Sequence, residues 1–397
     1  MCPCTCLAAA LACLDAVRLT ALNTVQALFT PNSGSSSANA GDIGSDLTGF
    51  FASFASLEAN PTDSSLREEV LSSASTLAGD VSNAAASLNA QQSSLDQEAS
   101  GVTSQVNALT GSIAQLNQQI QSVSPDADAG TLEDQRQQDL SQLSQLIGIN
   151  QITTENNGLS VTTTSGQLLV SEGSNVQLTT GSIGGVTHFF IGDDDVTTQL
   201  AEGGGALGGF LTVRDQDIPK VLSSLDQLAH SVSMQVNALN NQGTDLNGDT
   251  ANAGNIFSQP AQVAGAAALM SVVMTNPALI AAAGAGQGTG DNSNATAISS
   301  LADQAIVDGQ TPTDFYSTLV SSLGATVSSV QTQNTAQNAS VTQLQTQITA
   351  LTGVNLNDEA SALTLMERSY QAASQVFTIL NTIMTSALNL GDTTAVS

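Results

Sequence analysis

The feature that most constrains the fold is a long stretch, residues 65–121, that contains no proline and repeats its apolar residues every seven positions. One set is Ala74, Val81, Leu88, Leu95, Val102, Leu109 and Leu116, and a second set falls between them at Val106, Ile113 and Ile120. This spacing places both sets on one side of an α-helix, as in a coiled coil. At 1.5 Å per residue, such a helix is about 85 Å long. The repeat therefore predicts an elongated rod of long helices rather than a compact ball.

Helical spacing recurs along the rest of the chain, at residues 131–146, 208–238, 294–305, 315–352 and 358–390. The last of these has the most regular repeat, with apolar residues at both core positions of each heptad. We call this set the assembly seam: Leu363, Met366, Tyr370, Ala373, Phe377, Leu380, Met384 and Ala387. An apolar stripe of this kind needs a second helix to cover it. Residues 358–397 are therefore expected to form a C-terminal coiled-coil assembly helix.

The period changes in the middle of the chain. Short apolar runs separated by glycine turns are typical of antiparallel strands, and they occur at residues 159–162, 167–170, 176–178 and 187–191. Two further strands are predicted at residues 269–274 and 279–282, in a stretch of low polarity. The fold class expected is mainly α with a small antiparallel β region, about residues 158–192, set in an elongated rod of long helices.

The charge balance excludes two classes of partner. The chain has 6 Lys and Arg against 34 Asp and Glu, which gives a formal net charge of −28. A nucleic-acid backbone requires a basic face, and so does attraction to an anionic membrane surface. We therefore expect neither nucleic acid nor membrane as a partner.

The start of the chain is unusual, because all four cysteines lie there, at Cys2, Cys4, Cys6 and Cys13. These cysteines could bind a soft metal through their thiolates, or they could simply mark an atypical or wrongly assigned start of the chain. We favour an atypical start, because the spacing of the cysteines matches no zinc motif. No basic residue precedes Arg18, so a cleaved signal peptide is not expected, and no apolar run is long enough to span a bilayer. We expect residues 1–18 to be disordered and residues 19–357 to form one rod-like helical domain with the β region and loops rich in Gly and Asn.

Several motifs imitate functional sites but lack the context that those sites need. Residues 203–208 match a dinucleotide-binding glycine pattern without a buried strand before them, which favours a flexible start of a helix. Residues 245–249 resemble the start of a calcium loop but lack its later glycine and acid, and residues 193–195 fit a solvated hairpin end. His188 and His230 have no nucleophile beside them in sequence. No catalytic, cofactor or metal site is predicted, and the chain is not expected to be an enzyme.

Seven segments carry a resemblance to a known family. They are residues 53–71, with a Phe-rich helix end and an Asn-Pro-x-Asp turn, residues 205–215 (GALGGFLTVRD), 237–248 (NALNNQGTDLNG), 290–295, 314–316, 353–360 (GVNLNDEA) and 370–374 (YQAAS). Together they make the chain similar to the hook-associated protein 1 family of the bacterial flagellum, from about residue 19 to residue 390. The terminal motif is shared by flagellar axial proteins, whereas the two central motifs are specific to the proteins that join hook to filament.

The resemblance implies a structural subunit that joins hook to filament and assembles into a ring through terminal helices. It also implies contacts with hook protein and with a second junction protein or flagellin, an export chaperone, no cofactor, and a place outside the cell reached without a cleaved signal peptide. Two departures are visible: residues 1–18 lack the family's terminal helix and Pro-Gly-Tyr turn, and the outer β-domain that larger members insert near residues 257–262 is absent or minimal.

Other classes of function stay open beside this one. A flagellin-like subunit or a secreted coiled-coil adhesin has a similar helical pattern, although residues 205–215 and 237–248 speak against a flagellin. An enzyme carried on an axial scaffold requires a pocket with a carboxyl group of raised pKa.

Overall fold

The computed structural model describes residues 3–30, 43–123, 129–153, 158–249, 254–352 and 356–392. The chain divides into two compact units, residues 1–341 and 342–397. The division falls inside a helix rather than after residue 357, where the sequence suggested that the rod-like domain ends. The three functional domains expected from the sequence remain a prediction.

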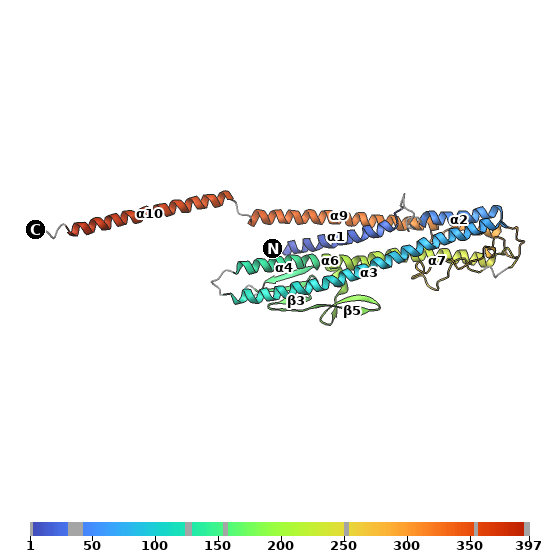
Figure 1. Cartoon of the computed structure of the whole chain (residues 1–397), viewed down its shortest axis with the longest axis horizontal. Coiled ribbons are helices and arrows are strands. Elements are labelled where there is room, and N and C mark those ends of the chain that lie inside the picture. Colours follow the sequence, from blue (N-terminus) through green and yellow to red (C-terminus); the bar gives the residue numbers. More distant parts are fainter. Residues whose placement is uncertain are drawn as a thin grey trace. The chain divides into compact units, whose positions relative to one another are not determined.

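A helical hairpin organises the first unit. Helix α2 (Ile43–Ala59) is followed by a turn and by α3 (Ser64–Ser122), a single helix of 59 residues, as the heptad pattern predicted. Asp63 is the N-cap of α3, and its carboxylate accepts hydrogen bonds from the backbone N–H groups of Ser65 and Leu66. Figure 1 shows α3 running along the first unit, with α2 beside one part of it and α4 beside the other.

The N-terminal segment is helical, which corrects the expectation that residues 1–18 are disordered. Helix α1 (Pro3–Leu28) is continuous through 26 residues and packs against α6 and α4. Ala10, Leu22 and Val25 of this helix are fully buried. The sequence indicates a short amphipathic helix at residues 19–29, which is the second part of α1. Residues 1–18 show little sign of a helix because the buried face there consists largely of small residues, whose periodicity is weak, and the order comes from packing against other helices.

Helix α1 also corrects the statement that no segment is long and apolar enough to span a bilayer. Residues Cys6–Leu28 meet that criterion by length and composition, and no other helix among the described residues does so. Asp15 and Arg18 interrupt the apolar run in this segment, so the run is visible only as an average over the window. In this structure α1 packs against α6 and α4, and 33% of its apolar window is buried. The test rests on length and composition only, and a buried core helix or a signal sequence can pass it as well.

Two small antiparallel sheets lie against α3, after α4 (Gly130–Leu146). The first sheet has the order β1 (Ile149–Thr153), β2 (Leu159–Thr163), β3 (Leu168–Ser171), β4 (Ser174–Asn175), and the second has β5 (Leu178–Ile183), β6 (Val186–Ile191), β7 (Asp194–Asp195). The predicted antiparallel region is confirmed, but it begins earlier than residue 158 and forms two sheets. Strand β1 escaped prediction because only Ile149 is buried in it, so no alternation is visible.

A chain of short helices leads from the sheets into a longer one. Helices α5 (Thr197–Gly203) and α6 (Gly205–Thr212) are followed by a π-helical turn, η3 (Val213–Asp217), and by α7 (Ile218–Gln242). Pro219 follows directly after the π-helical turn, and a proline inside a continuous helix removes a backbone hydrogen bond, which fits a widened turn at this place. The helix predicted at residues 208–238 is thus confirmed, with one widened turn inside it.

The segment after α7 is irregular, which makes the strand prediction at residues 269–274 and 279–282 wrong. It contains isolated bridges, a 3₁₀ turn η4 (Pro277–Leu279), helix α8 (Ser293–Ser299) and a second 3₁₀ turn, η5 (Ser300–Asp303). Side chains from α7 hold this segment in place. The carboxylate of Asp226 accepts hydrogen bonds from the N–H groups of Gly265 and Ala267. The side-chain amide of Asn240 donates to the carbonyl oxygen of Gly254 and accepts from the N–H group of Ala281.

Two long helices complete the chain as predicted, α9 (Pro312–Thr352) and α10 (Leu356–Asp392). Residues 353–355 of the GVNLNDEA motif lie outside the described residues. The first part of α9 contributes Leu319, Leu323 and Val330 to the core of the first unit.

The core of the first unit consists of two apolar clusters that share α3. Residues from Val70 to Leu95 of α3 belong to one cluster, with α2, α7, α8 and the start of α9. Residues from Ala99 to Ala114 of α3 belong to the other, with α4, the sheets, α5 and α6. Helix α3 therefore connects both halves of this unit without an interruption.

Candidate assembly surface

Both the composition of α10 and the seven-residue repeat of its apolar residues favour a helix. Its interior contains no proline or glycine, and Asp358 and Glu359 in its first turn favour the positive end of the helix dipole. Glu367 and Arg368 lie side by side in the sequence, away from the two core heptad positions.

All residues of the predicted assembly seam are exposed. The exposed fraction of the side chain is 75% for Phe377, 79% for Tyr370 and 74% for Met366. Leu363, Leu380 and Met384 are also more than half exposed, and Ala373 and Ala387 fall in the exposed class. Folded proteins seldom leave so many large apolar side chains in one exposed row unless another molecule binds them.

The apolar surface of α10 is wider than the seam. Leu365, Val376, Ile379 and Ile383 are also more than half exposed, and each of them precedes a seam residue by one position. Successive residues are rotated by about 100° around a helix, so seam and flanking residues together cover an arc of about 160°. We call this surface the apolar arc. Val376, Ile379 and Ile383 have the same spacing of three and four in the sequence, but they lie outside the two core positions of the heptad.

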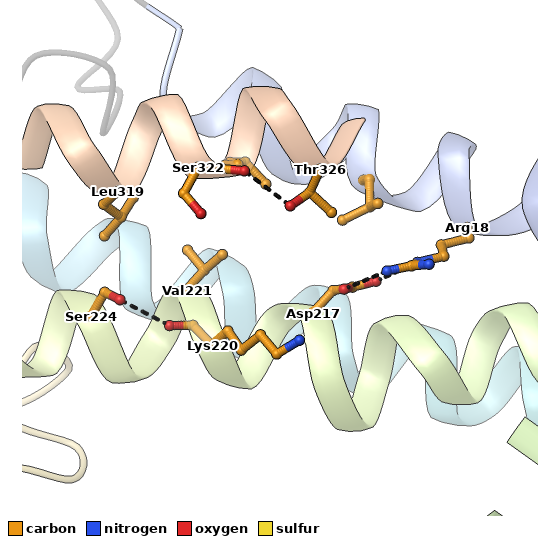
Figure 2. A pocket seen from close by; sticks show the side chains of 10 residues that line it. Arg18, Asp217, Lys220, Val221, Ser224, Leu319, Ser322 and Thr326 are labelled. Atoms are coloured by element: carbon orange, nitrogen blue, oxygen red, sulfur yellow. Dashed lines mark hydrogen bonds and ion pairs between the residues drawn. The ribbon is translucent and has the colours of Figure 1, made fainter. Parts of the chain in front are cut away.

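The first unit has a separate polar pocket between α1, α7 and α9, which Figure 2 shows. Its volume is about 220 Å³. The guanidinium of Arg18 donates two hydrogen bonds to the carboxylate of Asp217, at 2.8 and 3.0 Å. Hydrogen bonding to Asp217 raises the pKa of Arg18. This pair ties α1 to the π-helical turn, and Lys220 lies one turn further on.

The glycines of the GALGGFLTVRD motif allow helices to approach closely, rather than forming the flexible lead-in that we expected. Gly205 has φ +78°, and a Cβ added to it lies 2.5 Å from the backbone of Leu146 and Ile147. A Cβ on Gly209 lies 2.8 Å from the carbonyl oxygen of Leu14 in α1. The motif therefore sets the packing of α6 against α1 and the end of α4, and no phosphate-binding arrangement is needed to explain it.

Arg214 at the end of the same motif is buried and bound by two carboxylates. Its guanidinium donates to Asp215 at 2.7 and 2.9 Å and to Asp96 of α3. Burial lowers the pKa of Arg214, but the hydrogen bonds and charges of Asp215 and Asp96 outweigh burial and raise it. This network fastens the π-helical turn to the middle of α3.

The acidic motifs act in turns. Asp245 accepts hydrogen bonds from the N–H groups of Asn247 and Asp249, which makes residues 245–249 a polar turn of the kind that the sequence favoured. Asp195 accepts from the hydroxyl and the N–H of Thr197 and contacts His188 Nδ1 at 2.7 Å. This carboxylate therefore joins the end of a hairpin to the start of α5.

The cysteines of α1 do not form a metal site among the described residues, of which no three His, Cys, Asp or Glu side chains lie close enough to bind one ion. Cys2 lies outside those residues. Cys6 is buried and accepts a hydrogen bond from Gln151, and burial raises the pKa of the half-buried Cys13 thiol. A thiol of raised pKa is a poor metal ligand, because the thiolate binds metal.

Comparison with known proteins identifies the family. Residues 34–257 match the model of the flagellar hook-associated protein FlgK helical domain. The flagellar hook-associated protein 1 of Salmonella typhimurium is 24% identical over 88% of this chain and 81% of its own length, and that of Bacillus subtilis is 24% identical over 87% and 76%.

A solved structure has the same fold. The flagellar hook junction protein FlgK from Burkholderia pseudomallei superposes with a TM-score of 0.78, at 19% identity, over 89% of this chain and 100% of that structure. The matching family consists of structural proteins that are part of the extracellular flagellum. Because the family model covers more than half of the sequence, the chain belongs to the flagellar hook-associated protein FlgK family.

Proposed function

We propose that this chain is a structural subunit that joins hook to filament in the bacterial flagellum and that it assembles through α10. The observation that carries the proposal is the apolar arc. Covering a large apolar side chain stabilises a complex by about 1.5–3 kcal/mol, so the arc supplies a strong driving force for helix association.

The width of the arc supports assembly into a bundle rather than a simple pair. A two-stranded coiled coil buries a narrow stripe formed by two heptad positions, whereas a helix inside a larger bundle buries a wider one. We infer that α10 contacts more than one neighbouring helix. Ring formation by copies of this chain fits this requirement, and so do contacts with hook protein and with flagellin or a second junction protein.

Two further features belong to the proposal. Export without a cleaved signal peptide fits a subunit with no disulfide in its body, since all four cysteines lie within the first thirteen residues. A free subunit that presents the apolar arc requires protection from aggregation, so an export chaperone that covers α10 is expected.

The test replaces two seam residues by acids in the full chain, Leu380→Asp with Met384→Asp, and counts filaments attached to hooks by electron microscopy. The matched control places the same two charges on the opposite side of α10, Thr378→Asp with Thr382→Asp. Both variants lower the net charge equally and change only exposed positions.

We expect cells with the seam variant to carry bare hooks and to release filament protein into the medium, while the control variant supports normal filaments. Normal attachment of filaments by the seam variant refutes α10 as the assembly helix. Absence of the wild-type chain from isolated flagella refutes the function itself.

A further inference from the structure

Positive charge is scarce in this protein, and most of it is used internally. Only 6 of 397 residues are Lys or Arg. Four of the five arginines lie in the first unit and have internal partners there. Arg18 binds Asp217, Arg67 donates to the carbonyl oxygens of Pro61 and Ile280, Arg136 donates to Asn117, and Arg214 binds Asp96 and Asp215.

Lys220 differs from these arginines. It is the single lysine of the chain, it is exposed, and among the described residues its amino group has no hydrogen bond or ion pair. Figure 2 shows its side chain extending along α7 toward the end of the pocket that holds Asp217 and Arg18. Arg18 is bound by Asp217 and also faces Asp15, which does not line the pocket, so Lys220 gives the charged residues that line it one positive charge in excess.

The pocket suits a carboxylate side chain. Its volume of about 220 Å³ accommodates the end of an Asp or Glu side chain, and apolar walls from Leu22, Val221 and Leu323 fit the methylene groups. Ser322 on α9 supplies a hydroxyl to the opposite wall of the pocket, and this hydroxyl makes no side-chain hydrogen bond among the described residues. One cation and one hydroxyl donor are a suitable pair for a single carboxylate.

The proposed function supplies the partner. Copies of a chain with a net charge of −28 repel each other when they assemble, and each presents many acidic side chains to its neighbours. A cationic pocket on one copy therefore meets a carboxylate on the next more readily than any other charged group. We propose that Lys220 and its pocket receive an Asp or Glu side chain from a neighbouring copy of this chain, an inference that rests on the assembly role proposed above.

The uniqueness of Lys220 makes the proposal directly testable. A water-soluble carbodiimide activates a carboxylate, which then forms an amide bond with a contacting amine and loses the activating group as a urea. Apart from the N-terminal amine, Lys220 is the only amine in the chain. Flagella isolated from cells that express the full chain are treated with the carbodiimide, and the products are separated by denaturing gel electrophoresis and sequenced by mass spectrometry.

We expect a dimer of this chain joined through Lys220, with a yield that falls several-fold in 0.5 M NaCl before the reagent is added, because salt screens exposed charge pairs. Lys220→Arg keeps the charge but removes the reactive amine, so this variant should assemble normally and give no such dimer. Lys220→Glu reverses the charge and should reduce the number of subunits retained in isolated flagella.

The outcomes separate this inference from the function on which it rests. A product that joins Lys220 to a different flagellar protein, or no Lys220 product in flagella that contain the wild-type chain, overturns the inference and leaves the assembly role standing. Lys220→Glu flagella that retain as many subunits as wild type also overturn it. If the wild-type chain is absent from flagella, both proposals fail together.

Discussion

Buried amide side chains decide the conformation of the irregular segment beside α7. Asn237 is 1% exposed and makes three hydrogen bonds with backbone groups, accepting from the N–H groups of Ile256 and Phe257 and donating to the carbonyl of Phe257. Asn237→Ala leaves these groups buried without partners. We expect a loss of about 3 kcal/mol in the free energy of unfolding, measured by urea denaturation.

A neighbouring asparagine provides the control for this change. Asn241 donates one hydrogen bond to the side chain of Asn255 and is only partly buried. Asn241→Ala should cost less than about 1 kcal/mol, because water replaces the lost partner. Equal losses for the two variants would show that Asn237 does not hold the segment.

A second residue-scale prediction concerns the close approach at Gly205. Gly205→Ala introduces a Cβ against the backbone of Leu146 and Ile147, at a φ of +78° that alanine adopts only with strain. Gly184→Ala has a similar positive φ, +63°, but its Cβ points into open space. Calorimetry should show a cost of about 1 kcal/mol for Gly184→Ala and at least twice that for Gly205→Ala. Similar melting temperatures for the two variants contradict the packing role.

The third prediction concerns pH. Hydrogen bonds from the hydroxyl and N–H of Thr197 hold the pKa of Asp195 below its usual range, with a smaller contribution from His188. A carboxyl group whose pKa is lower in the folded state stabilises that state above its unfolded pKa, about 3.9, and the stabilisation is lost as the pH falls through the folded value. Asp195→Asn should therefore be less stable than wild type at pH 6, and the difference should shrink below pH 4.

The exposed neighbour Asp193 makes no hydrogen bond among the described residues and serves as the control. Urea midpoints of wild type, Asp195→Asn and Asp193→Asn at pH 6, 4 and 3 give the comparison. A difference between Asp195→Asn and wild type that grows as the pH falls has the wrong sign and refutes the assignment.

At the scale of elements, the sequence predicted those helices whose order depends on a regular apolar repeat. The heptads of α3, α9 and α10 gave their positions to within a few residues. The predictions for residues 1–18 and for residues 269–282 were wrong for a common reason. Small apolar residues carry little periodicity, and contacts with distant residues, such as that of Asn240 with Ala281, set the local structure. The glycines at the start of α6 match a dinucleotide-binding pattern in the sequence, but their role is to allow close contact with α1 and α4. The sequence could not show this role, because the contacting residues are distant along the chain.

The state of α10 before assembly gives an element-scale prediction. No side chain of α10 is buried among its described residues, whereas α3 buries Leu77, Val81 and Leu88 completely. Backbone amides exchange slowly only where opening exposes packed surface. In the free protein, hydrogen exchange should be at least a hundredfold faster in α10 than in the middle of α3. Equal protection of the two helices would mean that α10 already has a partner in the free chain.

At the scale of the whole molecule, the two units should differ in their contribution to stability. Both apolar clusters consist of residues up to Val330, and no described residue of the second unit belongs to either. A chain ending at Val341 should therefore unfold at the same urea concentration as the full chain and with a similar slope. A midpoint lowered by more than about 0.5 M would show that the second unit stabilises the first.

The continuity of α3 has a mechanical consequence. One uninterrupted helix carries the residues of both clusters, so a twist applied at the α2 end reaches the sheets without passing through a loop. Its backbone hydrogen bonds run along the helix axis, and bending it would disturb the packing of the two clusters against it. The two clusters are therefore coupled mechanically through one helix, and a deformation of either cluster is shared by the other.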